Sequence, residues 1–178
     1  MAGGRGTRLR PITNSIPKPM VKINNKPMLE IIINKAKSEG FVNIIITTHY
    51  KSKIIKDYFG DGSKFDVNIS YINEKKPLGT GGALAYLENK KKDPFVLTNC
   101  DLISDISFSN MLKFHKKHKF LATMAVRNEK VTSQFGVVKI KGNKLISIHE
   151  KPTINQLINT GIYILNHDFV KSIKKNTA

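Results

Sequence analysis

The sequence has a single cysteine, Cys100, and no tryptophan. One cysteine excludes an internal disulfide and a zinc site made of several cysteines, and it agrees with a reducing compartment. No apolar run approaches the roughly 20 residues that span a bilayer, and no charged leader followed by an apolar segment opens the chain. We therefore expect a cytoplasmic protein without a membrane partner.

Acidic residues are also scarce, with 13 aspartates and glutamates against 30 lysines and arginines, so the net charge is +17. A genome-wide bias toward lysine, asparagine and isoleucine would produce much of this excess. A field of this sign also attracts phosphate-bearing partners. The lysines are spread along the chain and are not interleaved with aromatic residues, so the pattern favours small anions over nucleic acid. A lysine-rich nucleic-acid-binding protein is kept as a third interpretation, which predicts affinity that falls steeply with salt.

Length and composition predict one compact domain, residues 1–178, because 178 residues with 40% hydrophobic side chains can bury one sizeable core. Segments with the apolar spacing of helices alternate with short apolar runs typical of buried strands. The expected helices are 27–39, 52–59, about 81–89 and 108–118, and the expected strands are 43–48, 67–72 and 94–98. This alternation indicates an α/β layered fold with a mostly parallel sheet.

The later part of the chain favours strands. They are expected at 120–127, 135–140, 144–150 and 159–165, followed by a last helix at 167–174. Gly142-Asn143 is a typical hairpin turn between the second and third of these strands. We therefore expect the parallel first part to be followed by an antiparallel or mixed extension.

The most informative segment is the loop at residues 2–19, AGGRGTRLRPITNSIPKP. Its glycines let the backbone approach a ligand closely and turn N–H groups toward it. Cations lie in the same stretch, at Arg5, Arg8, Arg10 and Lys18. A bound triphosphate needs both features, whereas a tight turn needs only the glycines. The loop has neither a Walker A sequence nor the spacing of a dinucleotide fingerprint.

From Gly3 to Met20 the chain resembles, position for position, the GGxGTRLxPxTxxxPKPM signature of the sugar-1-phosphate nucleotidyltransferase family. The resemblance implies a Rossmann-like layered nucleotidyltransferase fold with a mixed, mostly parallel central sheet and an antiparallel extension on the sugar side. In that family the loop wraps around the triphosphate, an arginine at the Arg8 position contacts the phosphates, and a lysine at the Lys18 position neutralises charge near the reacting phosphorus. The nucleotide-binding residues implied here are Ala2, Gly3, Gly4, Gly6 and Thr7.

Two further segments are similar to the nucleotide side of the family site. PLGTGGA at 77–83 resembles the loop that lies against the nucleobase, which gives Gly79 and Thr80 that role. Asn99-Cys100-Asp101 directly follows the strand expected at 94–98, which is where the family places the aspartate that binds magnesium. An isolated aspartate in a loop is more commonly an N-cap or turn residue, but this context favours the metal. Cys100 departs from the family pattern, which has a small glycine before the aspartate.

Segments near the end of the sequence resemble the sugar-phosphate side. Glu150-Lys151-Pro152 and Asn159-Thr160-Gly161 are similar to two such segments, and Gly136 lies in a neighbouring loop. The resemblance therefore implies sugar-phosphate binding by Gly136, Glu150, Lys151 and Asn159. An ordinary solvated lysine is the alternative interpretation of Lys151, and the sequence context favours phosphate contact. All these segments keep the order of the family, so the resemblance covers essentially the whole chain.

The implied reaction transfers a nucleoside monophosphate to a sugar 1-phosphate and releases pyrophosphate, with Arg8, Lys18 and Asp101 as catalytic residues and Mg²⁺ as cofactor. Glu74 lies five residues before Gly79, where many thymidylyl- and uridylyltransferases of the family offer a glutamine. A carboxylate can accept from both N1–H and the 2-amino group of guanine. This favours GTP, as in the mannose-1-phosphate guanylyltransferase-like branch, which includes relatives in cell-surface polysaccharide synthesis. UTP, dTTP and CTP are the alternative nucleotides.

The family also has a short apolar strand before the glycine loop and a second metal-binding aspartate after the last helix. This sequence has neither, so we expect a chain truncated at both ends. The alternative to an enzyme is a noncatalytic nucleotide-binding remnant or a regulatory subunit. Pyrophosphate release would separate the two. Homo-oligomerisation is left open, and no nucleic-acid partner is expected.

Overall fold

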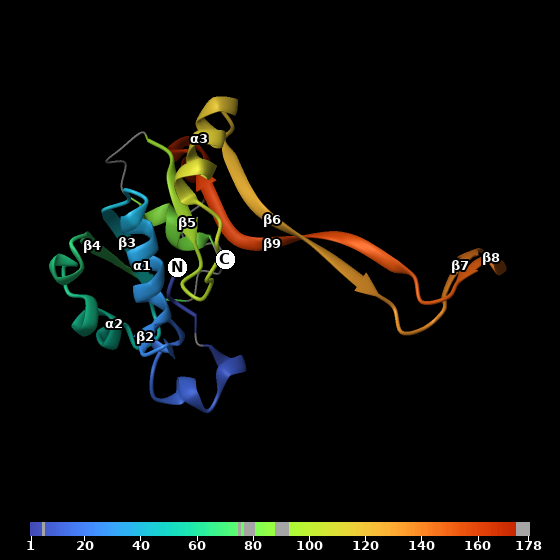
Figure 1. Ribbon diagram of the computed structural model, residues 1–178, viewed down its shortest axis with the longest axis horizontal. Coiled ribbons are helices and arrows are strands. Elements are labelled where there is room, and N and C mark those ends of the chain that lie inside the picture. Colours follow the sequence, from blue (N-terminus) through green and yellow to red (C-terminus); the bar gives the residue numbers. More distant parts are fainter. Residues whose placement is uncertain (5, 75, 77–80, 88–92, 174–178) are drawn as a thin grey trace. The chain divides into compact units, whose positions relative to one another are not determined.

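The computed structural model describes residues 1–4, 6–74, 76, 81–87 and 93–173 (Figure 1). Its elements, in chain order, are η1 Thr7–Leu9, η2 Ile12–Asn14, η3 Lys18–Met20, β1 Lys22–Ile23, β2 Lys26–Pro27, α1 Met28–Ser38, β3 Asn43–Thr48, α2 Ser52–Phe59, η4 Ser63–Phe65, β4 Asn68–Asn73, η5 Gly82–Tyr86, β5 Phe95–Thr98, α3 Phe108–His118, β6 Ala122–Thr132, β7 Val137–Lys141, β8 Lys144–His149, β9 Thr153–Leu165 and α4 His167–Lys171. They form two compact units. Unit 1 is Met1–Thr123 together with the chain from Gly161 onward, and unit 2 is Met124–Thr160.

The core of unit 1 lies where α1 and α2 pack against β3 and β4. These two strands pair in parallel, from Asn43 opposite Asn68 to Thr48 opposite Asn73. Side chains from both helices and both strands meet in one buried cluster, which contains Leu29, Ile33, Ile46, Ile55, Phe59 and Ile69. The helical spacing and the apolar strands that the sequence predicts are therefore both used to bury this cluster.

Strand β5 pairs antiparallel, whereas the sequence pattern predicts a parallel sheet for the first part of the chain. It pairs antiparallel with β9, from Phe95 opposite Leu165 to Thr98 opposite Ile162, in a sheet of order β5-β9-β6. The parallel pairing expected for the first part of the chain thus holds for β3 and β4 and not for β5. An apolar run identifies a buried strand but carries no information about which distant strand will lie beside it.

The helix expected at about 81–89 is also different in the structure. Residues Gly82–Tyr86 form a 3₁₀ helix, and 88–92 lie outside the described residues. Two glycines at the start of this segment disfavour an α-helix because glycine loses more backbone entropy than any other residue. By contrast, α1, α2 and α3 lie within one residue of their expected bounds.

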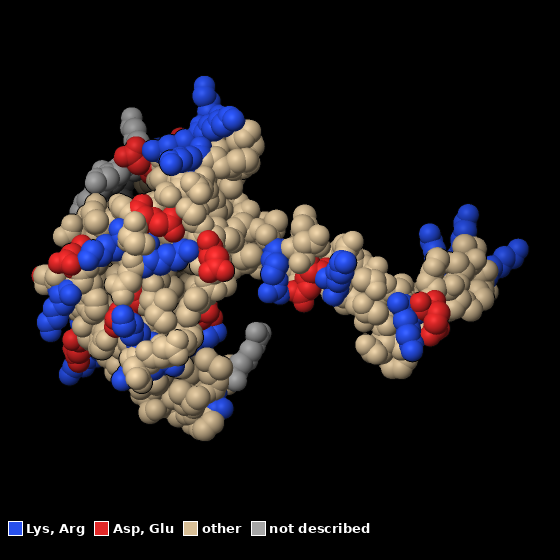
Figure 2. All heavy atoms as spheres, viewed as in Figure 1, with Lys and Arg blue, Asp and Glu red and all other residues tan. Residues whose placement is uncertain are grey.

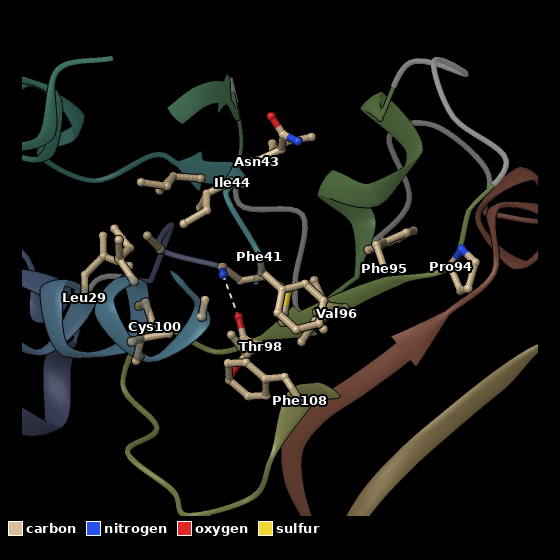
Figure 3. A pocket seen from close by; sticks show the side chains of 18 residues that line it. Leu29, Phe41, Asn43, Ile44, Pro94, Phe95, Val96, Thr98, Cys100 and Phe108 are labelled. Atoms are coloured by element: carbon tan, nitrogen blue, oxygen red, sulfur yellow. Dashed lines mark hydrogen bonds between the residues drawn. The ribbon is translucent and has the colours of Figure 1, made fainter. Parts of the chain in front are cut away.

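The first two residues hold the carboxyl ends of β3 and β5. The Ala2 amide donates to the Thr47 carbonyl over 2.9 Å, and the amino group of Met1 donates to the Thr98 carbonyl over 2.8 Å. Beside them is a largely apolar pocket of about 220 Å³, lined from α1, β3 and β5 and by Phe41 and Phe108 (Figure 3). The glycine loop consequently leaves the sheet where these two strands end.

Unit 2 contains the predicted hairpin. Strands β7 and β8 pair antiparallel from Val137 opposite His149 to Lys141 opposite Lys144, with a register shift between Lys139 and Ile140. Gly142 in the turn has a φ of 59°, a conformation that glycine adopts without strain. No helix in the described part of the chain is both long and apolar enough to cross a membrane.

Cys100 belongs to the core of unit 1 and not to its surface. The residue is buried in the cluster that includes Ala2 and Ile33, and its amide donates to the Met1 carbonyl over 3.1 Å. Burial raises the pKa of the thiol to about 11, because the thiolate is poorly solvated in the core. The thiol therefore stays protonated beside Asp101.

This environment predicts slow alkylation of Cys100. The rise from 9.0 to about 11 lowers the thiolate fraction on the order of a hundredfold in mildly alkaline buffer, and burial restricts access further. Iodoacetamide labelling followed by mass spectrometry should proceed slowly in the folded protein and at the rate of an unstructured cysteine peptide in denaturant. Equal rates in the two conditions would contradict the buried position.

Candidate functional site

The glycine loop contains one turn that only glycine can make without strain. Gly6 has a φ of 62°, and a Cβ placed on it would lie 2.9 Å from Cγ2 of Thr13 and 3.0 Å from Cβ of Lys18. Neither neighbour is the far end of a flexible side chain. Gly6 is therefore needed both for its backbone conformation and for this close packing.

The proposed catalytic lysine and the proposed metal ligand lie in contact. The Lys18 ammonium forms an ion pair with Oδ2 of Asp101, although 83 positions separate the two residues in the sequence. Lys18 is the first residue of η3, between two fully buried prolines, and Asp101 follows β5 by way of Asn99 and Cys100. Both side chains remain about one-third exposed, at 32% and 28%, so solvent and small ligands can reach the pair.

Asp101 is the carboxylate that could hold a divalent ion. Among the described residues there is no group of three or more histidine, cysteine, aspartate or glutamate side chains that could enclose a metal. Mg²⁺ bound with a nucleotide commonly takes one or two carboxylates and fills its other positions with phosphate oxygens and water. A single, partly exposed aspartate next to a cation fits that manner of binding, and it does not fit a closed structural metal site.

Glu74 lies against the start of the glycine loop. It directly follows β4, its amide donates to the Thr48 carbonyl over 2.8 Å, and its own carbonyl is 2.8 Å from Nδ1 of His49. A Cβ placed on Gly3 would lie 2.9 Å from Oε1 of Glu74, so the carboxylate touches the loop backbone. The structure thus brings Glu74 to the loop that the sequence assigns to the nucleotide.

Unit 2 contains the residues expected on the sugar-phosphate side. A Cβ on Gly136 would lie 2.9 Å from Oε2 of Glu150, so these two residues touch. Lys151 is exposed and has a φ of 43°, and Asn159 lies in β9. The predicted sugar-side loop and the segment that begins with Glu150 are therefore neighbours within this unit.

Within unit 1, Gly161 contacts the segment that leads to Asp101. Gly161 has a φ of 78°, and a Cβ on it would lie 2.5 Å from Nδ2 of Asn99. The backbone amide of Asn99 also donates to the Gly161 carbonyl over 3.2 Å. Gly161 thus supports the loop that presents Asp101, a role that sequence analysis did not assign to it.

Several predicted residues have little structural description. Gly79 and Thr80 lie outside the described residues, and so does the side chain of Arg8, whose backbone belongs to η1. Thr7 is exposed in the same short helix, and Gly4 has open space around the position of a Cβ. The roles of these residues stay predictions.

The sequence did not single out Thr13, Tyr50 and Lys51, which form a chain of contacts in which Tyr50 meets both Thr13 and Lys51. The Thr13 hydroxyl donates to the Gly6 carbonyl over 2.9 Å, and the Tyr50 hydroxyl donates to the Thr13 carbonyl over 3.3 Å. Thr13 stands inside the loop signature, so its fixed place there could have drawn attention to it. Nothing in the sequence near Tyr50 indicates this contact.

Basic side chains on the drawn face of the molecule are mixed with acidic ones (Figure 2). The last turn of α3 carries Lys116 and Lys117. The preference for small anions over nucleic acid stays a prediction.

Comparisons with known proteins identify the family of this chain. The nucleotidyl transferase family profile matches residues 1–178. A mannose-1-phosphate guanyltransferase from Hypocrea jecorina is 35% identical over 183 residues, which cover 98% of this chain and 50% of that protein. The chain spans about half the length of the curated relatives it matches.

Solved structures agree with this result. A protein from Bacillus anthracis, described as a glucose-1-phosphate thymidylyltransferase, has a TM-score of 0.77 and 26% identity, with 99% of this chain and 74% of that chain covered. HddC from Yersinia pseudotuberculosis, solved with GMP-PN, has a TM-score of 0.68 and 27% identity, with 99% and 79% covered. The family match, the curated relative and the shared fold together mean that this chain belongs to the sugar-1-phosphate nucleotidyltransferase family.

Proposed function

We propose that this chain carries the catalytic core of an enzyme that transfers a nucleoside monophosphate from its triphosphate to a sugar 1-phosphate and releases pyrophosphate. The observation that carries the proposal is the contact between Lys18 and Asp101. It brings together a cation from the glycine loop and a carboxylate from the end of β5, which are the two charges that a metal-bound triphosphate needs. The guanylyltransferase name of the Hypocrea jecorina relative supports the same reaction class.

The chemistry requires placement of two polyanions and not a strong base. An oxygen of the sugar phosphate is already ionised at neutral pH, so it can attack the α-phosphorus in line while pyrophosphate leaves. Ala2 anchors the loop through its bond to Thr47. The loop amides that follow it, together with Arg8, bind the triphosphate, and Lys18 offsets the charge that builds up near the reacting phosphorus. In unit 2, Glu150 and Lys151, with Gly136 and Asn159, bind the sugar phosphate. Asp101 would hold Mg²⁺, which when bound supplies further positive charge at the phosphates.

We further propose that the nucleotide is GTP. The Glu74 carboxylate lies against Gly3, at the start of the loop that we propose binds the nucleotide. A carboxylate can accept from two adjacent donors of guanine, whereas uracil and thymine present a donor flanked by acceptors. The GMP-PN complex of HddC supports guanine, while the thymidylyltransferase description of the other neighbour keeps UTP, dTTP and CTP as alternatives.

We propose that the sugar phosphate is mannose 1-phosphate or a related sugar 1-phosphate. The enzyme would act in the cytoplasm, and its nucleotide sugar would be used to make cell-surface polysaccharide. The alternative remains a noncatalytic nucleotide-binding member of the family. Such a protein would bind GTP and release no pyrophosphate from GTP and mannose 1-phosphate, so a coupled pyrophosphate assay alongside titration calorimetry separates the two.

The ion pair gives the first test of function. Lys18→Met and Asp101→Asn should each lower pyrophosphate release on the order of a hundredfold, because each removes a charge that stabilises the transition state. Lys22→Met, at an exposed lysine in the next strand, is the matched control and should keep near-normal turnover. Near-normal turnover in Asp101→Asn would remove the metal assignment. Circular dichroism of each variant checks that the fold is kept.

The base preference gives the second test. Glu74→Gln should lower kcat/KM for GTP about tenfold or more and should narrow or reverse its advantage over UTP and dTTP, because a charged acceptor for two donors becomes an amide. Nucleotide affinities from calorimetry provide the same comparison without turnover. A parent protein that prefers UTP or CTP to GTP would contradict the guanine assignment.

A further inference from the structure

The turn at residues 13–15, inside the glycine loop of residues 2–19, is held by the corner between β3 and α2. The Lys51 ammonium donates to the carbonyl of Asn14 and, over 2.8 Å, to the carbonyl of Ser15. The Tyr50 hydroxyl donates to the carbonyl of Thr13 over 3.3 Å. Three successive carbonyls at the end of η2 thus receive donors from two adjacent residues. Carbonyls at the end of a short helix have no partner within it, so these contacts fix the turn in place.

Thr13 connects this turn to Gly6, near the start of the loop. Its side chain is 2% exposed, and its hydroxyl donates to the Gly6 carbonyl over 2.9 Å. The same carbonyl also accepts the Leu9 amide over 2.9 Å, so both of its bonds hold the turn at Gly6. The Thr13 methyl group packs where a Cβ of Gly6 would be. One side chain therefore restrains Gly6 through a hydrogen bond and through packing.

The same contacts restrain Lys18. A Cβ placed on Gly6 would lie 3.0 Å from Cβ of Lys18, so the turn and the lysine are packed together. A displacement of Gly6 would thus shift the ammonium that contacts Asp101. Lys51 itself is engaged by two carbonyls, and its ammonium lies 5.5 Å from the Tyr50 ring, so its geometry is that of a support and not of a phosphate ligand.

We propose that Thr13 is a positioning residue that keeps the glycine turn and Lys18 in the geometry required for the triphosphate. Tyr50 holds its carbonyl, and Lys51 holds the two carbonyls that follow it. The effect of Thr13 on nucleotide binding rests on the proposed function. Its effect on the order of the loop does not, because Thr13 bonds Gly6 whether or not a ligand is present. No side chain of this group needs to touch the substrate.

The first measurement is hydrogen exchange at the Leu9 amide, followed by NMR in the full chain without nucleotide. Thr13→Val keeps the size and branching of the side chain and removes the hydroxyl. It should speed exchange at the Leu9 amide about tenfold or more, because the free energy of one hydrogen bond corresponds to about this ratio of exchange rates. Lys51→Met and Tyr50→Phe should act in the same direction. Thr13→Ser, which keeps the hydroxyl, should stay close to the parent. Lys53→Met, at an exposed lysine on α2, is the matched control.

The second measurement is the response to substrates. Thr13→Val and Lys51→Met should raise KM for the nucleotide about tenfold and lower kcat, up to on the order of a hundredfold if the loop moves by about 1 Å. KM for the sugar phosphate should stay unchanged, and Thr13→Ser should restore both nucleotide parameters. A purely structural role would instead lower the melting temperature and affect the two substrates equally.

The outcomes separate the two proposals. Unchanged Leu9 exchange in both Thr13→Val and Lys51→Met overturns the positioning role, and so does an equal rise of KM for both substrates. If the parent chain neither binds GTP nor turns it over, the proposed function fails while the exchange experiment still decides the role of Thr13. If Thr13→Val does not fold, Lys51→Met and Tyr50→Phe, which change partly exposed side chains, decide it instead.

Discussion

The ion pair between Lys18 and Asp101 is the contact on which the candidate site depends. A partly exposed pair of this kind adds little to the stability of a protein, because water and salt screen it. Its value is geometric: it fixes the end of the glycine loop against the segment that follows β5. A triphosphate bound as proposed would meet the Lys18 ammonium and the Asp101 carboxylate together, and neither segment alone provides both.

The scaffold explains why these groups meet at this place. Ala2 binds the carboxyl end of β3, the amino group of Met1 binds the end of β5, and Glu74 follows the end of β4. In α/β folds, ligands bind outside the carboxyl ends of the strands, where loops from neighbouring strands converge. The loop that begins at Ala2 is thus held at its start by the sheet, and Tyr50 and Lys51 hold it further along.

Much of the fold could be predicted from the sequence because local patterns decide it. The apolar spacing of α1 and α3 and the turn at Gly142 are properties of short segments, and the structure agrees with them. The segment at Gly82–Tyr86 was predicted less well, since its glycines weaken a helical pattern that its apolar residues suggest. The antiparallel partner of β5 could not be predicted, because pairing depends on a strand that comes more than sixty residues later.

The sequence by itself determined which groups are available: glycines and cations in the loop, and an aspartate shortly after an apolar strand. Only the tertiary structure decided which of these groups touch. Lys18 and Asp101 are 83 positions apart, and Tyr50 and Thr13 are 37 apart. Spacing along the chain carries no information about approach over such separations, since the packing of whole helices and strands sets it. The sequence therefore supplied the reactive groups, and the fold supplied their geometry.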